Sequence, residues 1–375
     1  MSFAVQNNIS REFINDYNIR TQKRRRMRQR QRAKFGFTLI MLLFFMMFIP
    51  KILWNTLDQL FIRGIINSKI KISKDSSLLN STEKIFANDY FLDKEFVGDV
   101  EVNKPLMRKI LLTQEMPILT YKLKNLAKQS PNLLPGIFIW DFSTGKYVNI
   151  NADKEFPTAS MIKIPVLFQL FRRTELGLIN LNDRIMLEKA YISEGSGYLQ
   201  YRPPGSTFAI YNLAQLMIQE SDNTATNILL ASVGGRNDLN RVMRSWGFSQ
   251  THLSDLLPDL YGTNVSTPKD LGTMLYNIDN PDFLTLENRA KIVEIMSHVR
   301  NRFLIQAGLP DSAQFIHKSG DIGTMLGDAG MVVLPDGRRY IIVVMVKRPW
   351  NSYSAKEFII QASKITYESI ASRNY

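Results

Sequence analysis

The chain has 375 residues, 45% of them hydrophobic and 22% charged, which is the composition of a globular protein with one or two domains. It contains no cysteine, so disulfides and thiolate metal sites are excluded. The three histidines, His252, His298 and His317, form no HExxH or HxH pattern, and no G-x-S-x-G elbow supports a Ser-His-Asp hydrolase. We therefore expect neither a metal ion nor a cofactor.

The net charge of +13 is concentrated at the N-terminus. Residues 1–34 contain ten lysines and arginines but only two acidic residues, Glu12 and Asp16, so this segment carries +8 and the other 341 residues about +5. A nucleic-acid-binding protein needs a basic face on its folded part. The distribution therefore predicts a basic tail and no nucleic-acid partner.

An uncharged apolar run, FGFTLIMLLFFMMFIP at residues 35–50, follows the basic tail directly. With the next four residues it is long enough to span a bilayer as a helix. A buried core helix would have a polar face, and a cleaved signal peptide would have small residues where Pro50 and Lys51 stand. We therefore predict an uncleaved anchor over residues 35–55 in the lipid bilayer of the cytoplasmic membrane. The positive-inside rule places the tail in the cytoplasm and the rest of the chain outside, in the periplasm or its equivalent.

The next segment, residues 56–107, is polar and weakly patterned, which predicts a stalk or linker. Apolar residues spaced three and four apart then predict a helix over 107–129. Two short stretches with strand character, 136–142 and 146–152, flank a Ser-Thr-Gly turn and predict a β-hairpin.

Helical patterns fill the middle of the chain. A proline is tolerated only near the first turn of a helix, so Pro165 predicts a helix that begins at or just after Ser160. Further helices are predicted over 212–235 with an interruption around Ser221, over 236–247, and from Thr267 and Pro268 onward.

A strand, a Pro-Asp-Gly turn and a second strand over 330–346, followed by an amphipathic helix over 354–372, close the chain. Strands at both ends with helices between them predict an α+β fold, in which an antiparallel sheet is flanked by helices and an all-α domain is inserted. The folded domain is expected over 108–375, with its α/β part at 108–157 and 276–375 and its helical part at 158–275.

Three short motifs occur in a fixed order. Ser-x-x-Lys alone is not informative, because it occurs five times, starting at Ser68, Ser81, Ser143, Ser160 and Ser266. The copy Ser160–Lys163 is singled out by Ser221-Asp222-Asn223, which lies 61 residues further on, and by Lys318-Ser319-Gly320, which lies 97 residues after Ser221. Three ordered motifs are far less probable by chance than any one of them.

The region 108–375 resembles the class A β-lactamases and the penicillin-binding proteins built on the same fold, whose signature is S-x-x-K, S-D-N and K-[ST]-G. A serine hydroxyl needs a neighbouring base, and lysine serves as one only if burial or nearby positive charge lowers its pKa. The resemblance implies a cleft between the sheet and the helical part, with catalytic residues Ser160, Lys163 and Ser221 and substrate-binding residues Asn223, Lys318, Ser319, Gly320 and Asp321.

The roles of these residues also follow from the resemblance. Ser160 would be the nucleophile, Lys163 its base, and Ser221 the proton relay to the leaving amine. Asn223 would bind the substrate amide, and Lys318 and Ser319 its carboxylate. The backbone N–H groups of Ser160 and Asp321 would form the oxyanion hole. We expect Asp222 to fix its loop through backbone hydrogen bonds and His317 to be a packed strand residue.

The sequence departs from the β-lactamase pattern at the water-activating loop. That loop reads Glu-Pro-x-Leu-Asn in the family, and here it reads Leu257-Pro258-Asp259-Leu260-Tyr261. Leucine cannot accept a proton, and the flanking Asp255 and Asp259 are candidate substitutes with altered positions. A second departure follows Lys318-Ser319-Gly320, where we find no arginine for the substrate carboxylate.

These departures favour an enzyme that is acylated by β-lactams and releases them slowly. The resemblance is closest to the class-A-like DD-peptidases of cyanobacteria, which implies a membrane-anchored serine D-Ala-D-Ala peptidase acting on peptidoglycan stem peptides. A true β-lactamase with a relocated base is one alternative. A non-catalytic sensor of muropeptides or β-lactams is another, although a site that only binds ligand has no need of Lys163.

Overall fold

The computed structural model describes residues 107–375. The predicted tail, anchor and stalk therefore lie outside the described residues, except for the last stalk position. No helix within residues 107–375 is long and apolar enough to cross a membrane.

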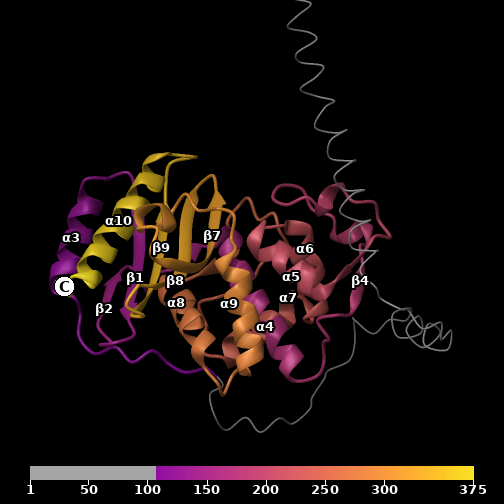
Figure 1. The fold of residues 1–375 in the computed structure, drawn as a ribbon. Helices are drawn as coiled ribbons and strands as arrows, with labels where there is room; N and C mark the ends of the chain where they lie inside the picture. Colours follow the sequence, from indigo (N-terminus) through magenta and orange to yellow (C-terminus); the bar gives the residue numbers. More distant parts are fainter. Residues whose placement is uncertain (1–106) are drawn as a thin grey trace, which may run out of the picture. The chain divides into compact units, whose positions relative to one another are not determined.

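A five-stranded antiparallel sheet forms the centre of the fold, with the strand order β2-β1-β9-β8-β7 (Figure 1). The central strand β9 is buried at seven consecutive residues because helices cover both faces of the sheet. The edge strand β7 lies next to the helical part of the molecule. The strands are β1 (Leu134–Asp141), β2 (Tyr147–Ile150), β7 (Gln314–Ile322), β8 (Met325–Val333) and β9 (Arg339–Lys347).

Successive residues of β9 serve two different cores. Ile342 and Val344 pack with the apolar faces of α3 (Pro117–Lys128) and α10 (Ser354–Ala371) on one side of the sheet. Ile341 and Val343 belong to the larger core on the other side, which contains α8 (Pro268–Tyr276) and continues into the helical part.

The helical part is built around α4, whose first nine residues are all buried. Its helices are α4 (Lys163–Glu175), α5 (Ile210–Gln219), α6 (Asn223–Ser232), α7 (Gly235–Ser245) and α9 (Leu286–Ser297). Two small sheets, β3 (Phe156–Pro157) with β6 (Val265–Ser266) and β4 (Arg184–Met186) with β5 (Thr207–Ala209), complete the described strands. Short 3₁₀ helices are η1 (Ala159–Ile162), η2 (Lys189–Tyr191), η3 (Leu199–Tyr201), η4 (Asn277–Asp279) and η5 (Ile305–Gly308).

Most of the predicted elements are confirmed. The hairpin at β1–β2, the break between α5 and α6 at Ser221 and the closing helix α10 are all present. Thr267 caps α8, because its side-chain oxygen accepts the backbone N–H of Asp270 at 3.0 Å.

Three expectations need correction. The first helix begins at Pro117 rather than at residue 107, because the residues before it run without regular structure to the bridge between Glu115 and Tyr147. In the helix expected at or just after Ser160, the α-helix α4 begins only at Lys163, because Ser160 lies in the 3₁₀ turn η1. The boundary expected at residues 275–276 falls inside α8, which packs on the sheet with Gly272 against the ring of Phe138.

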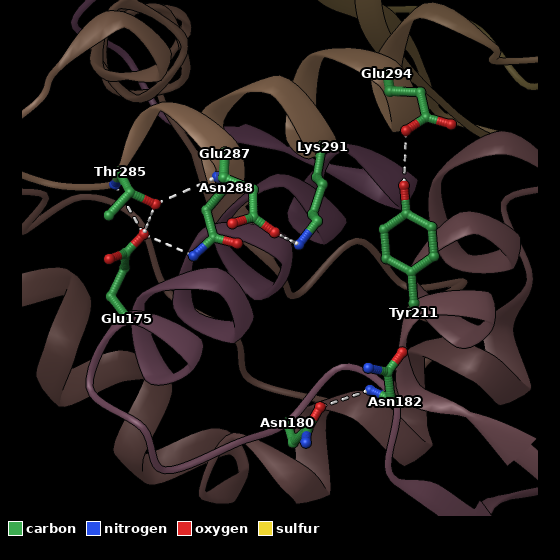
Figure 2. A network of polar contacts seen from close by, with 9 residues as sticks. All are labelled: Glu175, Asn180, Asn182, Tyr211, Thr285, Glu287, Asn288, Lys291 and Glu294. Carbon is green, nitrogen blue, oxygen red and sulfur yellow. Dashed lines mark hydrogen bonds and ion pairs between the residues drawn. The ribbon is translucent and has the colours of Figure 1, made fainter.

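The far end of α4 is fixed to α9 by one carboxylate (Figure 2). Glu175 Oε1 accepts hydrogen bonds from the backbone N–H of Thr285 at 2.8 Å, from its hydroxyl at 2.7 Å and from Asn288 Nδ2 at 2.6 Å. Burial raises the pKa of Glu175, but the hydrogen bonds from Thr285 and Asn288 outweigh burial and lower the pKa overall. Glu175 therefore stabilises the start of α9 in its ionised form.

Glu175→Gln is expected to lower the melting temperature by about 2–4 °C, because a charged acceptor shared by three donors contributes about 1 kcal/mol net. The lowered pKa means that this contribution is present above the unfolded-state pKa and is lost as pH falls through the folded-state pKa. The matched control is Glu287→Gln, which removes an exposed carboxylate in the first turn of α9 that pairs with Lys291. Thermal unfolding followed by circular dichroism checks the prediction, and equal melting temperatures for the two variants would contradict it.

Candidate active site

The predicted nucleophile lies at a strained turn beside the edge strand. Ser160 is in η1, directly after Ala159, which has a φ of +45°. This left-handed conformation is unfavourable for alanine by roughly 1–3 kcal/mol and persists only where the surroundings hold it. The backbone N–H of Lys163 bonds to the carbonyl of Ser160. In a 3₁₀ turn the side chains at i and i+3 eclipse, so the Ser160 and Lys163 side chains lie on one face.

Lys163 has no exposed surface and is surrounded by three oxygen atoms of the S-D-N motif. Its Nζ lies 2.5 Å from the carbonyl oxygen of Ser221, 3.1 Å from the Ser221 hydroxyl oxygen and 3.0 Å from Asn223 Oδ1. A neutral amine has two N–H donors and one lone pair. The carbonyl and the amide oxygen can take the two hydrogens, which leaves the lone pair to accept a proton from a serine hydroxyl.

The electrostatic surroundings favour this neutral form. Burial lowers the pKa of Lys163 well below its ordinary value, and the positive charge of Lys318 lowers it further, while Asp222 acts in the opposite direction. Burial and a nearby cation, the two effects that can lower the pKa of a lysine enough for it to act as a base, are therefore both present.

The S-D-N motif is held in place by its middle residue. Asp222 caps α6 by accepting the backbone N–H of Ala225 at 2.8 Å, and its other oxygen accepts the N–H of Leu199 at 2.9 Å. Ser221, just before it, has a φ of +56°, so its carbonyl and its hydroxyl both reach Lys163. The expectation that Asp222 fixes its loop through backbone hydrogen bonds is confirmed.

The side chain of Asn223 bridges the lysine and the neighbouring loop. Its Oδ1 accepts from Lys163, and its Nδ2 donates to the carbonyl of Glu194 at 3.0 Å. Because an amide nitrogen carries two hydrogens, the bond to Glu194 leaves one N–H for the substrate amide that the sequence predicts.

Strand β7 brings the third motif against η1. A Cβ atom on Gly320 would lie 2.6 Å from the Thr158 carbonyl oxygen, so only glycine allows β7 to approach the Ser160 turn this closely. Lys318 is buried, and its Nζ donates to the carbonyl of Ser319 at 2.8 Å. Burial lowers the pKa of Lys318 to about 8, although Asp328 opposes the shift.

The structure therefore places the predicted residues as follows. Direct hydrogen bonds join Lys163, Ser221 and Asn223, and Gly320 touches the turn that contains Ser160. Lys318 and Ser319 are buried on the edge strand, whereas Asp321, at the end of the same strand, is exposed.

In the loop at the expected base position, both carboxylates that could replace the missing general base are already engaged in hydrogen bonds. Leu257 is buried, its carbonyl accepts from the Ser193 hydroxyl and from Asn227 Nδ2, and its peptide bond to Pro258 is cis. The buried Asp259 accepts three bonds from Thr263 and Asn264 in its own loop. Asp255 accepts the backbone N–H of Leu256. The side chains of both candidate substitutes therefore bond within this loop.

Sequence reasoning missed a residue beside the site. Arg348 follows β9, and its guanidinium pairs with the carboxylate of Asp321. The two residues are 27 positions apart, and only the antiparallel register of β7, β8 and β9 brings them together. An arginine two residues after the predicted strand that ends at residue 346 was the available signal.

The side chain of His317 lies on the face of β7 opposite to Lys318 and Gly320, because successive residues of a strand alternate between its two faces. Its ring is buried, stacks on Phe315 with ring centroids 4.3 Å apart, and its Nδ1 lies 2.8 Å from Asp328 Oδ1. This confirms the expectation of a packed strand residue. Among residues 107–375, no group of three or more His, Asp or Glu side chains could hold a metal ion.

The comparisons with known proteins agree with this geometry. A sequence model of the β-lactamase enzyme family matches residues 118–370. The β-lactamase VEB-1 of Pseudomonas aeruginosa is 24% identical over 273 residues, which are 66% of this chain and 89% of that protein. The β-lactamase ROB-1 of Haemophilus influenzae is 29% identical over 224 residues, which are 56% of this chain and 70% of that protein.

Solved structures show the same relationship. PBP-A is 36% identical and superimposes with a TM-score of 0.69, covering 70% of this chain and all of PBP-A. A leucine-to-glutamate variant of PBP-A, solved as an acyl-enzyme complex with penicillin G, is also 36% identical, with a TM-score of 0.67 and coverage of 69% and 98%.

The fold and the three motifs define a serine hydrolase with an α+β class A architecture, as the resemblance predicted. The chain belongs to the β-lactamase enzyme family.

Proposed function

We propose that this protein is a membrane-anchored, penicillin-binding serine DD-peptidase. It acts on the D-Ala-D-Ala ends of peptidoglycan stem peptides through an acyl-enzyme on Ser160. Residues 35–55 anchor it in the cytoplasmic membrane, and the hydrolase domain lies outside, where that substrate is found.

Acylation follows from the contacts of Lys163. The Ser160 oxygen attacks the substrate carbonyl carbon while its proton passes to the neutral Nζ of Lys163. The C–N bond then breaks, and the leaving nitrogen receives a proton through the Ser221 hydroxyl, which lies 3.1 Å from the same Nζ. Lys318 and Ser319 bind the substrate carboxylate, and the backbone N–H groups of Ser160 and Asp321 stabilise the oxyanion.

Leu257 is the observation that favours a peptidase over a β-lactamase. Its buried side chain stands where the family carries a glutamate that activates water, and Asp255 and Asp259 bond within their own loop. A linear peptide releases its amine product and leaves room for water or another amine. A β-lactam keeps its amine attached to the acyl group, so its release depends on an activated water.

The relative PBP-A supports the same reading. Its leucine-to-glutamate variant has been solved as an acyl-enzyme complex with penicillin G. We infer that β-lactams also acylate the present chain.

Intact-mass spectrometry of the full-length protein with benzylpenicillin tests the proposal. We expect one penicillin adduct per chain, located on Ser160 by peptide mapping, which persists after excess ligand is removed. Ser160→Ala should form no adduct, while Ser143→Ala, at another Ser-x-x-Lys site, should react normally. Rapid penicillin hydrolysis without an accumulated adduct would support a β-lactamase instead. Neither adduct nor turnover would favour a non-catalytic sensor.

A further inference from the structure

The turn between β7 and β8 is held by the segment that follows β9. The backbone N–H of Arg348 donates to the carbonyl of Thr324 at 2.9 Å, and the N–H of Asn351 donates to the carbonyl of Gly323 at 2.8 Å. The Trp350 ring lies against the same turn, since a Cβ atom on Gly323 would come within 2.6 Å of it. This segment, residues 348–352, therefore fixes the end of the strand that contains Lys318.

The Arg348 side chain is 6% exposed and reaches back along this turn. Its guanidinium donates to the Asp321 carboxylate, to the carbonyl of Ile322 at 3.1 Å and to the carbonyl of Ser352 at 3.4 Å. The Asp321 carboxylate itself is 58% exposed. A buried arginine thus supports an exposed acidic group directly after the K-S-G motif.

The position of Asp321 relative to the motif makes its charge important. Alternate residues of a strand point to one face, so Ser319 and Asp321 share a face and are separated by about 7 Å along β7. This distance is below the Debye length of about 8 Å at physiological ionic strength. An unpaired carboxylate at Asp321 would therefore repel an anionic group bound at Ser319 and Lys318.

We propose that Arg348 is a positioning residue that acts through Asp321. It compensates the Asp321 carboxylate, so that the site accepts acyl donors carrying a negative charge, and it holds the backbone N–H of Asp321 in the oxyanion hole. This inference rests on the proposed function, because it assumes that Lys318 and Ser319 bind the carboxylate of the acyl donor.

The arrangement differs from direct recognition of the ligand by arginine. The guanidinium already has Asp321 and two carbonyl groups as partners, and only a small part of it reaches the surface. Removal of the arginine therefore does more than delete an attraction, because it leaves the Asp321 charge uncompensated.

The test is a double-mutant cycle in the full-length protein with Arg348→Gln, Asp321→Asn and the combination of both. The rate constant for acylation of Ser160 is measured with benzylpenicillin, which is anionic, and with its methyl ester, which is neutral. We expect Arg348→Gln to slow acylation by benzylpenicillin about tenfold, the effect of one nearby unpaired charge, and to affect the ester much less. Adding Asp321→Asn to Arg348→Gln should restore most of the lost rate.

The outcomes separate this role from a purely structural one. If Arg348→Gln slows both ligands equally and Asp321→Asn gives no rescue, Arg348 only supports the turn and the inference is overturned. Full activity of Arg348→Gln would also overturn it. Should Arg348→Gln fail to fold, Arg348→Lys keeps the positive charge beside Asp321, so its ratio of acylation rates for benzylpenicillin and the ester should stay close to that of the wild type.

The proposed function can fail independently of this inference. Fast release of the wild-type adduct would refute the peptidase but leave the acylation rates comparable between variants. Absence of rescue would refute the role of Arg348 and leave the peptidase intact. A wild-type chain that reacts with neither ligand would overturn both.

Discussion

Replacing Lys163 with methionine is expected to slow acylation of Ser160 by benzylpenicillin about 10²–10⁴-fold, which is the usual contribution of a positioned general base. Methionine is unbranched and only one atom shorter than lysine, but it has no basic group that can accept the serine proton. It also leaves the Ser221 carbonyl and Asn223 Oδ1 without their donor, so some loss of stability is expected as well.

Two further measurements separate the lost base from a packing defect. Thermal unfolding shows whether Lys163→Met is folded at the assay temperature. Lys163→Arg retains donors for the Ser221 carbonyl and for Asn223 but remains protonated, so it should also lose acylation. If either folded variant is acylated within about threefold of the wild-type rate, Lys163 is not the base.

The pH profile of acylation gives an independent check. Acylation needs neutral Lys163, so its rate should rise with pH through the pKa that burial and Lys318 have lowered. Binding of an anionic ligand needs charged Lys318, whose pKa is about 8, so the rate should fall above that pH. Stopped-flow measurements should give a bell-shaped curve for the wild type, and the rising limb should be absent in Lys163→Met.

The sequence was most informative where the chemistry depends on local spacing. Ser160 and Lys163 lie in one turn, and Ser221 and Asn223 flank a single helix cap, so each pair is visible in a short string. The order of strand and helix patterns predicted the sheet and the helical part, and the order of the three motifs then pointed to the family. Sequence reasoning also assigned Asp222 and His317 to structural roles that their hydrogen bonds confirm.

The features that sequence reasoning missed depend on contacts between residues that are far apart in the chain. Arg348 meets Asp321 only through the register of three strands. The left-handed backbone at Ala159 has no signal in its side chain, since alanine rarely adopts this conformation. The helix expected from residue 107 has the apolar spacing of a helix, but its first ten residues have no regular structure apart from the bridge at Glu115, and the Met116 N–H bonds to the backbone of β2.

Whereas Lys163→Met should slow a step of the reaction, Leu257→Glu is expected to speed one, the release of the acyl group. We expect release of the penicillin adduct to become about 10²-fold faster, the lower end of the contribution of a general base. A carboxylate at this buried position would have a raised pKa, which suits a base that works near neutral pH. The effect should stay at the lower end because Tyr261, where the family has an asparagine, is 92% exposed and cannot help to hold the water.

Leu257→Gln is the matched control, because it has nearly the same shape as the glutamate variant and cannot accept a proton at neutral pH. Both variants place a polar group among buried apolar side chains, so both should melt below the wild type. Any general loosening of the loop would therefore speed release equally in the two. Intact-mass spectrometry after removal of excess penicillin measures the decay of the adduct in each.

Equal release from the glutamate and glutamine variants would show that residue 257 does not face the acyl group and that the loop has been aligned wrongly. Faster release from the glutamate variant alone would place the difference between a penicillin-binding protein and a β-lactamase at this one side chain. The acylation site of Ser160, Lys163 and Ser221 would then be the same in both kinds of enzyme. The two kinds of enzyme would differ in whether the loop beside that site supplies a proton acceptor for water. In this chain the acidic residues of the loop, Asp255 and Asp259, accept hydrogen bonds from the loop itself, and a buried leucine occupies the position of the acceptor.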